Sequence, residues 1–458
     1  MLISSGHSEQ QRRHPHGHGH GQALVRALVR AFVLWKSVLL LLVVASSLGG
    51  PPYDTSTTLV AQRALDFNES ALDLGAKLTR WDAIYFVQNA RRGYLFEQEW
   101  AFGSGMPFLI STVVRAFAYL GIEPTSQWEP LVGVCITHAS HLLSVLVLYH
   151  LGLKIGKDPK ASFVAALLHI VSPAGIFLSA PYQESTFALL SFLGYLLLAH
   201  GCLGHSRSIR KDAAIVSSGI VFGLATLFRS NGLLSGVSFA IFALAQLHRL
   251  VTTSMSLVDL RRLVALGVGG IAVAMGSLVP QALAYQTFCT ESSVTATLRP
   301  WCQKTLPSIY TFVQEKYWNV GLFRYWTPGN IPLFLLSAPV LFLMMRSGLA
   351  TLRPRREVAP ESSSKSAAVL QQQRSPDDAS LFVGAMALSQ VILTTLAITT
   401  YHIQIITRIA SAYPVWYWWL AGQLGQSTTA KFGGGVVIFM VMYASIQGAL
   451  FASFLPPA

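Results

Sequence analysis

The chain has 458 residues, of which 52% are hydrophobic and only 12% are charged. Apolar runs of about 20 residues recur along it, and each is long enough to cross the hydrocarbon core of a bilayer. This pattern excludes a soluble multidomain protein and predicts an all-α polytopic membrane protein. The net charge of +13 is spread over short loops instead of one soluble domain, which excludes a nucleic-acid binder and is typical of cytosolic loops.

Residues 1–30 form a polar, basic leader that contains a His-Gly repeat. Such a repeat can chelate a metal, but its composition favours a low-complexity tail, so we predict a disordered cytosolic leader without a metal site. We predict that the run 31–49 is a transmembrane signal anchor, within which the stem of Lys36 reaches toward the near headgroups. Arg26 and Arg30 place the N-terminus in the cytosol.

Residues 50–103 then lie on the opposite, lumenal side of the membrane. We predict that they form a catalytic loop with surface helices around 72–94. Asn68 begins an N-x-S sequon and is a glycosylation candidate on this side. Farther along, Asp82 follows Arg80 and Trp81 directly before an apolar run. An ionisable residue beside a bilayer indicates a functional site, whereas the structural alternative is a helix-capping or ion-paired Asp in a loop.

Clusters of Lys and Arg predict four cytosolic loops, at 154–160, 207–211, 249–262 and 346–374. Because the chain crosses the membrane an even number of times between two such loops, most apolar runs occur in pairs. Four such pairs, with the unpaired runs 31–49, 131–152 and 432–452, predict about eleven transmembrane helices. The run 104–121 breaks this parity, so we expect it to be re-entrant or interfacial. The predicted organisation is a membrane core at 104–346 with a lumenal loop at 286–328, a disordered cytosolic connector at 347–379, and C-terminal helices at 380–458.

This topology collects unusual polar residues from five segments on the lumenal face. They are Asp82 with Arg80 and Trp81, Glu184, Arg229, Arg324 with Trp326, and His402 with Arg408. A carboxylate can act as a general base toward a hydroxyl, arginines match phosphate oxygens, and Trp or Tyr rings offer faces to sugars. Together these residue types predict glycosyl transfer from a lipid-linked phosphosugar.

Each of these residues also has a structural interpretation. Glu184 is suited to the start of a helix, Arg229 to a headgroup anchor, the tryptophans to an interfacial belt, and His402 to a satisfied structural histidine. Cys289 and Cys302 share the lumenal loop and are a disulfide candidate, with two free thiols as the alternative. The chain has no Walker loop and no zinc-protease motif, so we predict neither a metal nor a cofactor.

Six stretches of the chain, from Arg80 to Arg408, are distinctive. They are RWDAIYFVQNARRGYLFEQEWAFGSGMPFL, SAPYQES, FRSNG, PWCQKTLPSIYTFVQEKYWNVGLFRYW, IPLFLLSAPV and HIQIITR. In these stretches the chain resembles the PIG-V family of glycosylphosphatidylinositol (GPI) mannosyltransferases. The family usually has Phe-Pro-Gly before the proline that closes the first stretch, whereas this chain has Phe102-Gly103-Ser104-Gly105-Met106-Pro107.

The resemblance implies a GT-C type fold in the endoplasmic reticulum (ER) membrane, with a lumenal active site. The implied reaction transfers the second mannose from dolichol-phosphate-mannose to the GPI precursor, forms an α-1,6 bond and inverts the configuration. Asp82 would then be the base toward the acceptor hydroxyl or its orienter. Arg408, Arg324 or His402 would hold the dolichyl phosphate, and Glu184 and Arg229 would orient a substrate.

Other functions remain as alternatives at this stage. Another dolichol-phosphate-sugar transferase of the GT-C type would use the same residue types with a different acceptor. A polytopic transporter would show an inverted repeat, which we do not find, and a non-catalytic subunit would have no use for the acids and arginines on one face. The expected partners are the lipid-linked donor, the GPI precursor, the ER membrane and a small membrane subunit.

Overall fold

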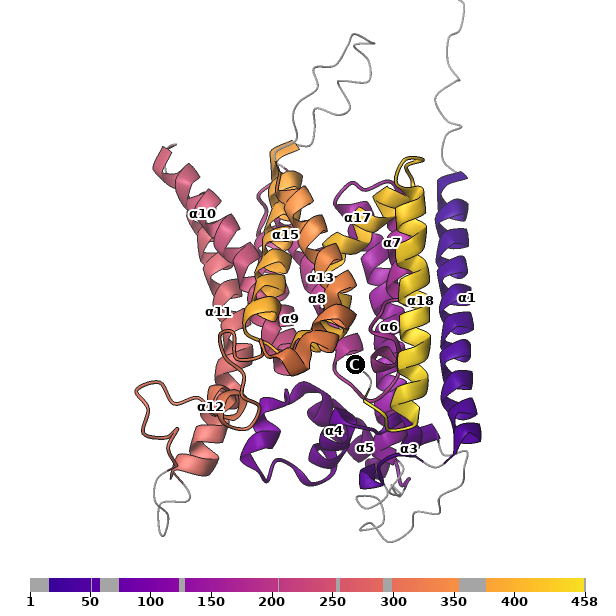
Figure 1. Cartoon of the computed structure of the whole chain (residues 1–458). Coiled ribbons are helices and arrows are strands. Elements are labelled where there is room, and N and C mark those ends of the chain that lie inside the picture. The colour runs from indigo at the N-terminus through magenta and orange to yellow at the C-terminus, as the bar shows by residue number, and fades with distance from the viewer. Residues whose placement is uncertain are drawn as a thin grey trace, which may run out of the picture.

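The computed structural model in Figure 1 describes residues 16–50, 52–57, 74–122, 128–204, 206–252, 256–290, 299–353 and 376–456. Over these residues the secondary structure is helical, without a β-strand. The all-α architecture predicted from the apolar runs is therefore confirmed. The glycosylation candidate Asn68 lies outside the described residues.

Nine helices in the described part of the chain are long and apolar enough to cross a membrane. They are α1 (His16–Ala45), α6 (Trp128–Lys154), α8 (Glu184–Cys202), α9 (Ile209–Phe228), α10 (Gly236–Thr252) with η4 (Ser230–Ser235), α11 (Leu257–Tyr285), α13 (Ile331–Leu352), α15 (Pro376–Thr399) and α18 (Ala430–Ala452). They pack side by side as one bundle (Figure 1). The protein is thus a multi-pass membrane protein.

Two further apolar helices complete the bundle but are too short to span it alone. They are α7 (Pro159–Ile170) and α17 (Pro414–Leu424). The 3-10 helix η3 (Gly175–Leu178) follows α7, and the run η7 (Ile403–Ile405), α16 (Ile406–Ile409) and η8 (Ala410–Ala412) precedes α17. These broken segments are two of the expected crossings, and they bring irregular, polar backbone to one end of the bundle, where such backbone can line a cavity.

A group of short helices covers the end of the bundle that is lowest in Figure 1. This group, here named the cap, consists of α3 (Leu74–Leu78), α4 (Asp82–Arg92), η2 (Glu97–Ala101), α5 (Gly105–Tyr119) and α12 (Ile309–Lys316). The π-helical turn η5 (Gln286–Thr290) extends α11 into the cap. The N-terminal end of α1 lies at the opposite end of the bundle (Figure 1).

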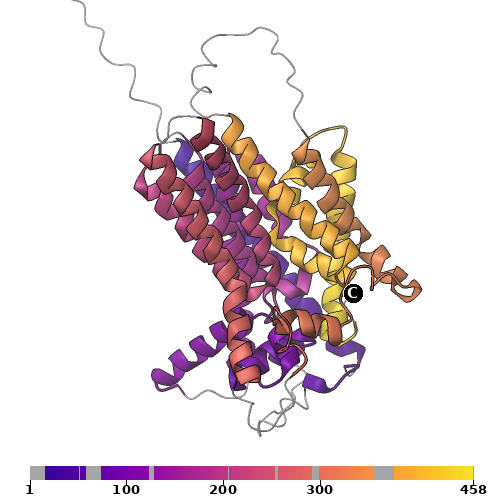
Figure 2. The same cartoon turned by 90° about the vertical axis from the view of Figure 1, so that its left-hand side faces the viewer.

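Helix α5 does not cross the bundle. Its 15 residues would span only about 22 Å, which is less than the hydrocarbon thickness. Figure 2 shows it running outward from the lower end of the bundle, and the side chains of Phe108 and Tyr119 are largely exposed. Of the two placements expected for 104–121, re-entrant or interfacial, this arrangement agrees with the interfacial one.

Small residues let α9 and α11 approach each other closely. A Cβ added to Gly219 would lie 2.4 Å from Cα of Gly269, and one added to Gly276 would lie 2.1 Å from the carbonyl oxygen of Gly223. Such glycine contacts are typical of membrane helices, where close backbone packing stabilises association. The tight pairing holds the end of α9, which is followed directly by Arg229.

The predicted leader is wrong in part. Residues 16–30 belong to α1 instead of a disordered tail, because the apolar face of α1 continues N-terminally and buries Leu28. Residues 1–15 lie outside the described part of the chain, as do 354–375 of the predicted connector. The flanks of that connector are helical, since α13 ends at Leu352 and α15 begins at Pro376.

The prediction that Lys36 reaches the headgroups is also wrong. Its side chain is buried, and Nζ donates hydrogen bonds to the carbonyl oxygen of Leu178 at 2.6 Å and to Oγ of Ser179 at 2.8 Å. The reason is that α1 packs beside α18 and turns this face of the helix inward (Figure 1). Lys36 therefore ties α1 to the end of η3.

Candidate active site

A cavity of about 630 Å³ lies where the bundle meets the cap. The broken segments of the bundle form one side and the cap forms the other. The bundle side is lined by Phe177, Tyr182, Arg229, Asn231, His402 and Arg408. The cap side is lined by Trp81, Asp82, Tyr85, Gln98, Phe102, Gln314 and Trp318. Concave sites with a few converging polar groups are the usual binding sites of proteins.

The backbone around Asp82 is held by a tyrosine from the opposite side of the cavity. The hydroxyl of Tyr182 accepts a hydrogen bond from the Asp82 backbone N–H at 3.1 Å and donates one to the carbonyl oxygen of Arg80 at 3.2 Å. Trp81, between these residues, has a φ of 54°, in the left-handed region that bulky residues rarely adopt. Such backbone strain is found where a residue must be aimed in one direction.

Asp82 and Glu184 each begin a helix. Asp82 is the first residue of α4 and Glu184 the first of α8, where the free N–H groups favour a negative charge. Neither acid is the N-cap residue of its helix or makes a side-chain cap hydrogen bond, so the structural interpretation holds only for their position in the first turn. It does not account for their shared partner, an arginine from a third segment.

Arg408 joins the two acids. Its Nη1 lies 3.0 Å from Oδ2 of Asp82, and its Nε donates to Oε1 of Glu184 at 2.8 Å. Arg229 reaches the same Glu184 oxygen with Nη1, also at 2.8 Å. Glu184 is fully buried, whereas the Asp82 side chain is 34% exposed. The chain of four charges thus ends in one carboxylate that is open to the cavity.

Two aromatic rings support the Arg408 guanidinium. Its carbon lies 4.4 Å from the ring centre of Phe177 and 4.9 Å from that of Tyr182. Cations are attracted to ring faces, most strongly where water is excluded. Because Phe177 belongs to η3, the turn that Lys36 holds also positions the arginine.

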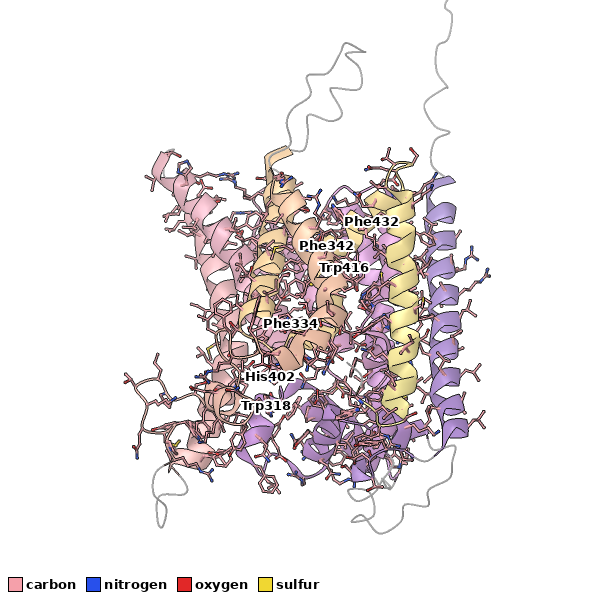
Figure 3. The ribbon with its side chains drawn as sticks, viewed as in Figure 1. Trp318, Phe334, Phe342, His402, Trp416 and Phe432 are labelled. Carbon is pink, nitrogen blue, oxygen red and sulfur yellow. A yellow bond between two sulfur atoms is a disulfide. The ribbon has the colours of Figure 1, made fainter. Side chains whose placement is uncertain are left out.

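His402 and Trp318 connect the two sides of the cavity. Nε2 of His402 bonds to the backbone carbonyl oxygen of Trp318 at 2.8 Å, and the ring stacks on Tyr325 with centroids 4.7 Å apart. Figure 3 shows both residues at the level where the bundle meets the cap, below Phe334. His402 therefore belongs to the cavity, although its contacts differ from those of a phosphate ligand.

Two residues expected at the site lie outside the cavity. Arg324 pairs with Glu315 at 3.1 Å, and both side chains are more than 40% exposed. Trp326 is 55% exposed, and its Nε1 donates to the carbonyl oxygen of Ile398 at 2.7 Å. The segment that carries them leaves the cavity after Val320, so neither residue lines it, and the interfacial interpretation suits Trp326 better.

Arg80 supports the site from behind without lining it. Its side chain is buried, and the guanidinium carbon lies 4.9 Å from the ring centre of Phe454. Phe454 also packs against Trp81, with ring centroids 5.3 Å apart. The segment after α18 thus folds back beneath Trp81, and Pro456 reaches the cavity itself.

Sequence reasoning missed several cavity residues. Tyr85 lies one turn after Asp82 on α4, a spacing that puts both on one helix face and could have revealed it. Burial, and then the Asp82 carboxylate, raises the pKa of Tyr85, which keeps its hydroxyl protonated. Gln98 and Gln314 carry no comparable signal, because isolated glutamines in polar loops are common.

A disulfide between Cys289 and Cys302 fixes the loop beside the cap. In the structure these cysteines are therefore disulfide-bonded and are not two free thiols. The same loop buries Trp301, whose Nε1 donates to Oε1 of Glu97 at 2.8 Å, and Arg299 pairs with the same oxygen at 2.7 Å. Trp301 is therefore not part of an interfacial belt. It holds η2, which carries Gln98 into the cavity.

Comparison with known proteins shows the family to which the chain belongs. A family model described as mannosyltransferase (PIG-V) matches residues 25–458. A curated relative from Chaetomium globosum, named GPI mannosyltransferase 2, is 49% identical over 94% of this chain and 96% of its own length. Proteins of the same name from Gibberella zeae and Schizosaccharomyces pombe are 43% and 34% identical, over 95% and 83% of this chain and 98% and 73% of theirs.

Among solved structures, an oligosaccharyltransferase from Archaeoglobus fulgidus is similar with a TM-score of 0.44 at 16% identity, over 92% of this chain and 53% of that one. The family match covers nearly the whole chain, and it includes each of the segments that form the cavity. This protein therefore belongs to the PIG-V family of mannosyltransferases and is a membrane-embedded glycosyltransferase.

Proposed function

We propose that this protein transfers the second mannose of the GPI anchor from dolichol-phosphate-mannose to the one-mannose GPI precursor, with the cap on the lumenal side of the ER membrane. The observation that carries the proposal is the ion pair between Asp82 and Arg408 at the wall of the cavity. It places an open carboxylate beside a cation that is fixed by a buried acid. The names of the relatives support the acceptor.

The proposed reaction is a single displacement. The acceptor hydroxyl oxygen attacks the anomeric carbon of the donor mannose, and its proton passes to the Asp82 carboxylate. The bond from the anomeric carbon to the phosphate oxygen breaks, and its electron pair leaves with dolichyl phosphate. Because the donor is β-linked, attack from the opposite face produces the α-linkage. The reaction as written needs no metal or cofactor.

The two cavity arginines are suited to the phosphate. Nη2 of Arg229 and Nη2 of Arg408 have no partner in the described part of the chain, and both side chains line the cavity. Guanidinium groups offer planar donors to phosphate oxygens, and donors fixed in advance stabilise charge as it develops on a leaving group. This assigns the phosphate to Arg229 and Arg408, without Arg324.

The test is GPI-precursor analysis in cells that lack their own second mannosyltransferase. The chain should clear the one-mannose intermediate, and Asp82→Asn, expressed equally, should let it accumulate. The matched control is Asp158→Asn at the N-cap of α7, where Asn caps a helix about as well as Asp. Full clearance by Asp82→Asn would remove Asp82 as the base, and no clearance by the unmodified chain would remove the proposed acceptor.

The alternative is a dolichol-phosphate-sugar transferase with another acceptor. It is favoured only by the amides and aromatic rings of the cap side of the cavity, which do not discriminate between sugars. Transfer of radiolabelled mannose in membranes, followed by separation of lipid-linked products, distinguishes the two, because a labelled two-mannose GPI precursor arises only in the first case.

A further inference from the structure

The cavity has two chemically different halves. The bundle half contains the charged chain of Arg229, Glu184 and Arg408, which the proposed reaction uses for the phosphate. The cap half contains one acid, the proposed base Asp82, and otherwise neutral amides and aromatic rings. Its neutral lining residues include Tyr85, Gln98, Phe102, Gln314 and Trp318. A neutral lining beside the base suits an uncharged part of a substrate.

Three rings make a continuous wall in the cap half. Tyr85 and Phe102 stack with centroids 4.6 Å apart and an interplanar angle of 18°, and Phe102 meets Trp318 edge to face at 5.2 Å. The rings come from α4, from the linker after η2 and from the turn after α12. Apolar ring surfaces are suited to the carbon-bound hydrogens of a sugar ring.

Two amides stand beside this wall. Gln98 on η2 and Gln314 on α12 line the cavity, and neither side-chain amide has a hydrogen-bond partner in the described part of the chain. Each amide presents two N–H donors and one oxygen acceptor. Polar groups that line a cavity in this way are the ones that give a binding site its specificity.

His402 adds an acceptor from the bundle side of the cavity. A carbonyl oxygen only accepts hydrogen bonds, so the 2.8 Å contact to Trp318 puts the proton of the neutral ring on Nε2. Nδ1 is then an acceptor, and stacking on Tyr325 limits rotation of the ring. A neutral His402 can therefore accept a hydrogen bond from a hydroxyl but cannot donate one from Nδ1 to a phosphate oxygen.

We propose that Gln98, Gln314 and His402, set against the wall of Tyr85, Phe102 and Trp318, form the subsite that binds the acceptor sugar. The inference deepens the proposed function and rests on it. Tyr85 and Asp82 share one face of α4, so a sugar on the wall lies beside the proposed base. In this arrangement the phosphate and the acceptor sugar occupy opposite halves of the cavity.

The test measures donor and acceptor dependence separately. Full-length protein in detergent micelles receives a short-chain dolichyl-phosphate-mannose and a synthetic one-mannose GPI precursor, and each is varied while the other is held constant. Gln98→Ala, Gln314→Ala and His402→Gln should each raise the acceptor KM about tenfold, the effect of one lost hydrogen bond of ordinary strength. The donor KM should stay within about twofold.

The variants are chosen to keep the fold. His402→Gln preserves an N–H near the Nε2 position, which can still donate to Trp318, but removes the acceptor at Nδ1. The control is Gln426→Ala, an exposed glutamine between α17 and α18 at the other end of the bundle, which should leave both KM values unchanged. Melting temperatures of all four variants should match that of the unmodified protein.

Two outcomes would overturn the subsite. One is a rise in the donor KM with an unchanged acceptor KM, which would assign the cap half to the donor sugar. The other is three variants that behave as Gln426→Ala does. If the unmodified protein uses a different lipid-linked acceptor, the proposed function is overturned but the subsite is not. The donor and acceptor KM values of the variants, measured with that other acceptor, then decide this inference.

Discussion

The hydroxyl of Tyr182 accepts a hydrogen bond from the backbone N–H of Asp82 across the cavity, at 3.1 Å. The same hydroxyl donates to the carbonyl oxygen of Arg80, so one side chain holds the backbone on both sides of Trp81. Tyr182 comes from the turn before α8, about a hundred residues from its partners. Two distant segments of the chain are thus fastened at the residue that bears the proposed base.

Replacing Tyr182 with Phe should therefore lower activity more than stability. The change removes both hydrogen bonds but keeps the ring that supports Arg408, and each bond contributes about 1 kcal/mol. We expect kcat to fall about tenfold, because the Asp82 carboxylate is less well oriented. Steady-state kinetics and thermal unfolding in detergent measure the two effects. Tyr119→Phe, at a largely exposed residue of α5, is the control, and an unchanged kcat for Tyr182→Phe would contradict the prediction.

Replacing Arg408 with Lys should abolish most activity. Arg408 uses Nη1 for Asp82 and Nε for Glu184, and a single ammonium cannot reproduce both contacts with the geometry of a guanidinium. Loss of one donor that is fixed in advance toward the developing charge lowers kcat about a hundredfold or more, so we expect a fall of at least that size. Arg324→Lys is a matched control outside the cavity and should retain normal turnover. Equal activity of the two variants would show that the Asp82–Arg408 pair is dispensable.

Replacing Lys36 with Met should affect both the fold and the site. The loss leaves the hydroxyl of Ser179 without its donor, at a cost of about 1–3 kcal/mol for a buried group, and leaves the carbonyl oxygen of Leu178 with only the longer hydrogen bond from Oγ of Ser185 at 3.3 Å. Because η3 also carries Phe177, we expect a lower melting temperature together with a lower kcat. Lys431→Met, at the exposed start of α18, should change neither. A variant with normal stability and turnover would mean that η3 is held without α1.

Replacing Cys289 and Cys302 with Ser should loosen the cap while leaving the bundle intact. A cross-link over this sequence separation of 13 contributes about 3 kcal/mol, and the loop it closes holds η2 through Trp301 and Glu97. We expect faster limited proteolysis between α11 and α12 and a higher acceptor KM. Cys135→Ser, a free cysteine on α6, is the control. Unchanged proteolysis of the double variant would mean that the packing of Trp301 alone holds the loop.

The sequence predicted the bundle and the centre of the site because both depend on the cost of polar groups near a bilayer. Asp82, Glu184, Arg229 and Arg408 stand out against apolar surroundings, and the structure does bring them together. Arg324 and Trp326 have the same composition signal, but the turn that directs them outward depends on tertiary contacts such as that between Phe323 and Thr399.

Lys36 and Phe454 make contacts that could not be predicted from the sequence. No local pattern reveals that Lys36 faces inward, because burial of a lysine depends on which neighbour α1 packs against. The contact of Phe454 with Arg80 and Trp81 joins residues from opposite ends of the chain. Gln98 and Gln314 lie on the short helices η2 and α12, which are too brief for the periodicity on which a sequence-based prediction relies.

The four linked side chains also constrain how charge is distributed during the proposed reaction. Two carboxylates and two guanidinium groups sum to zero before transfer, and uptake of a proton by Asp82 leaves the set with one positive charge. The departing dolichyl phosphate gains one negative charge in the same step. The total charge of the cavity and its contents therefore stays constant, so a poorly solvated site need only redistribute charge and never accommodate an additional ion.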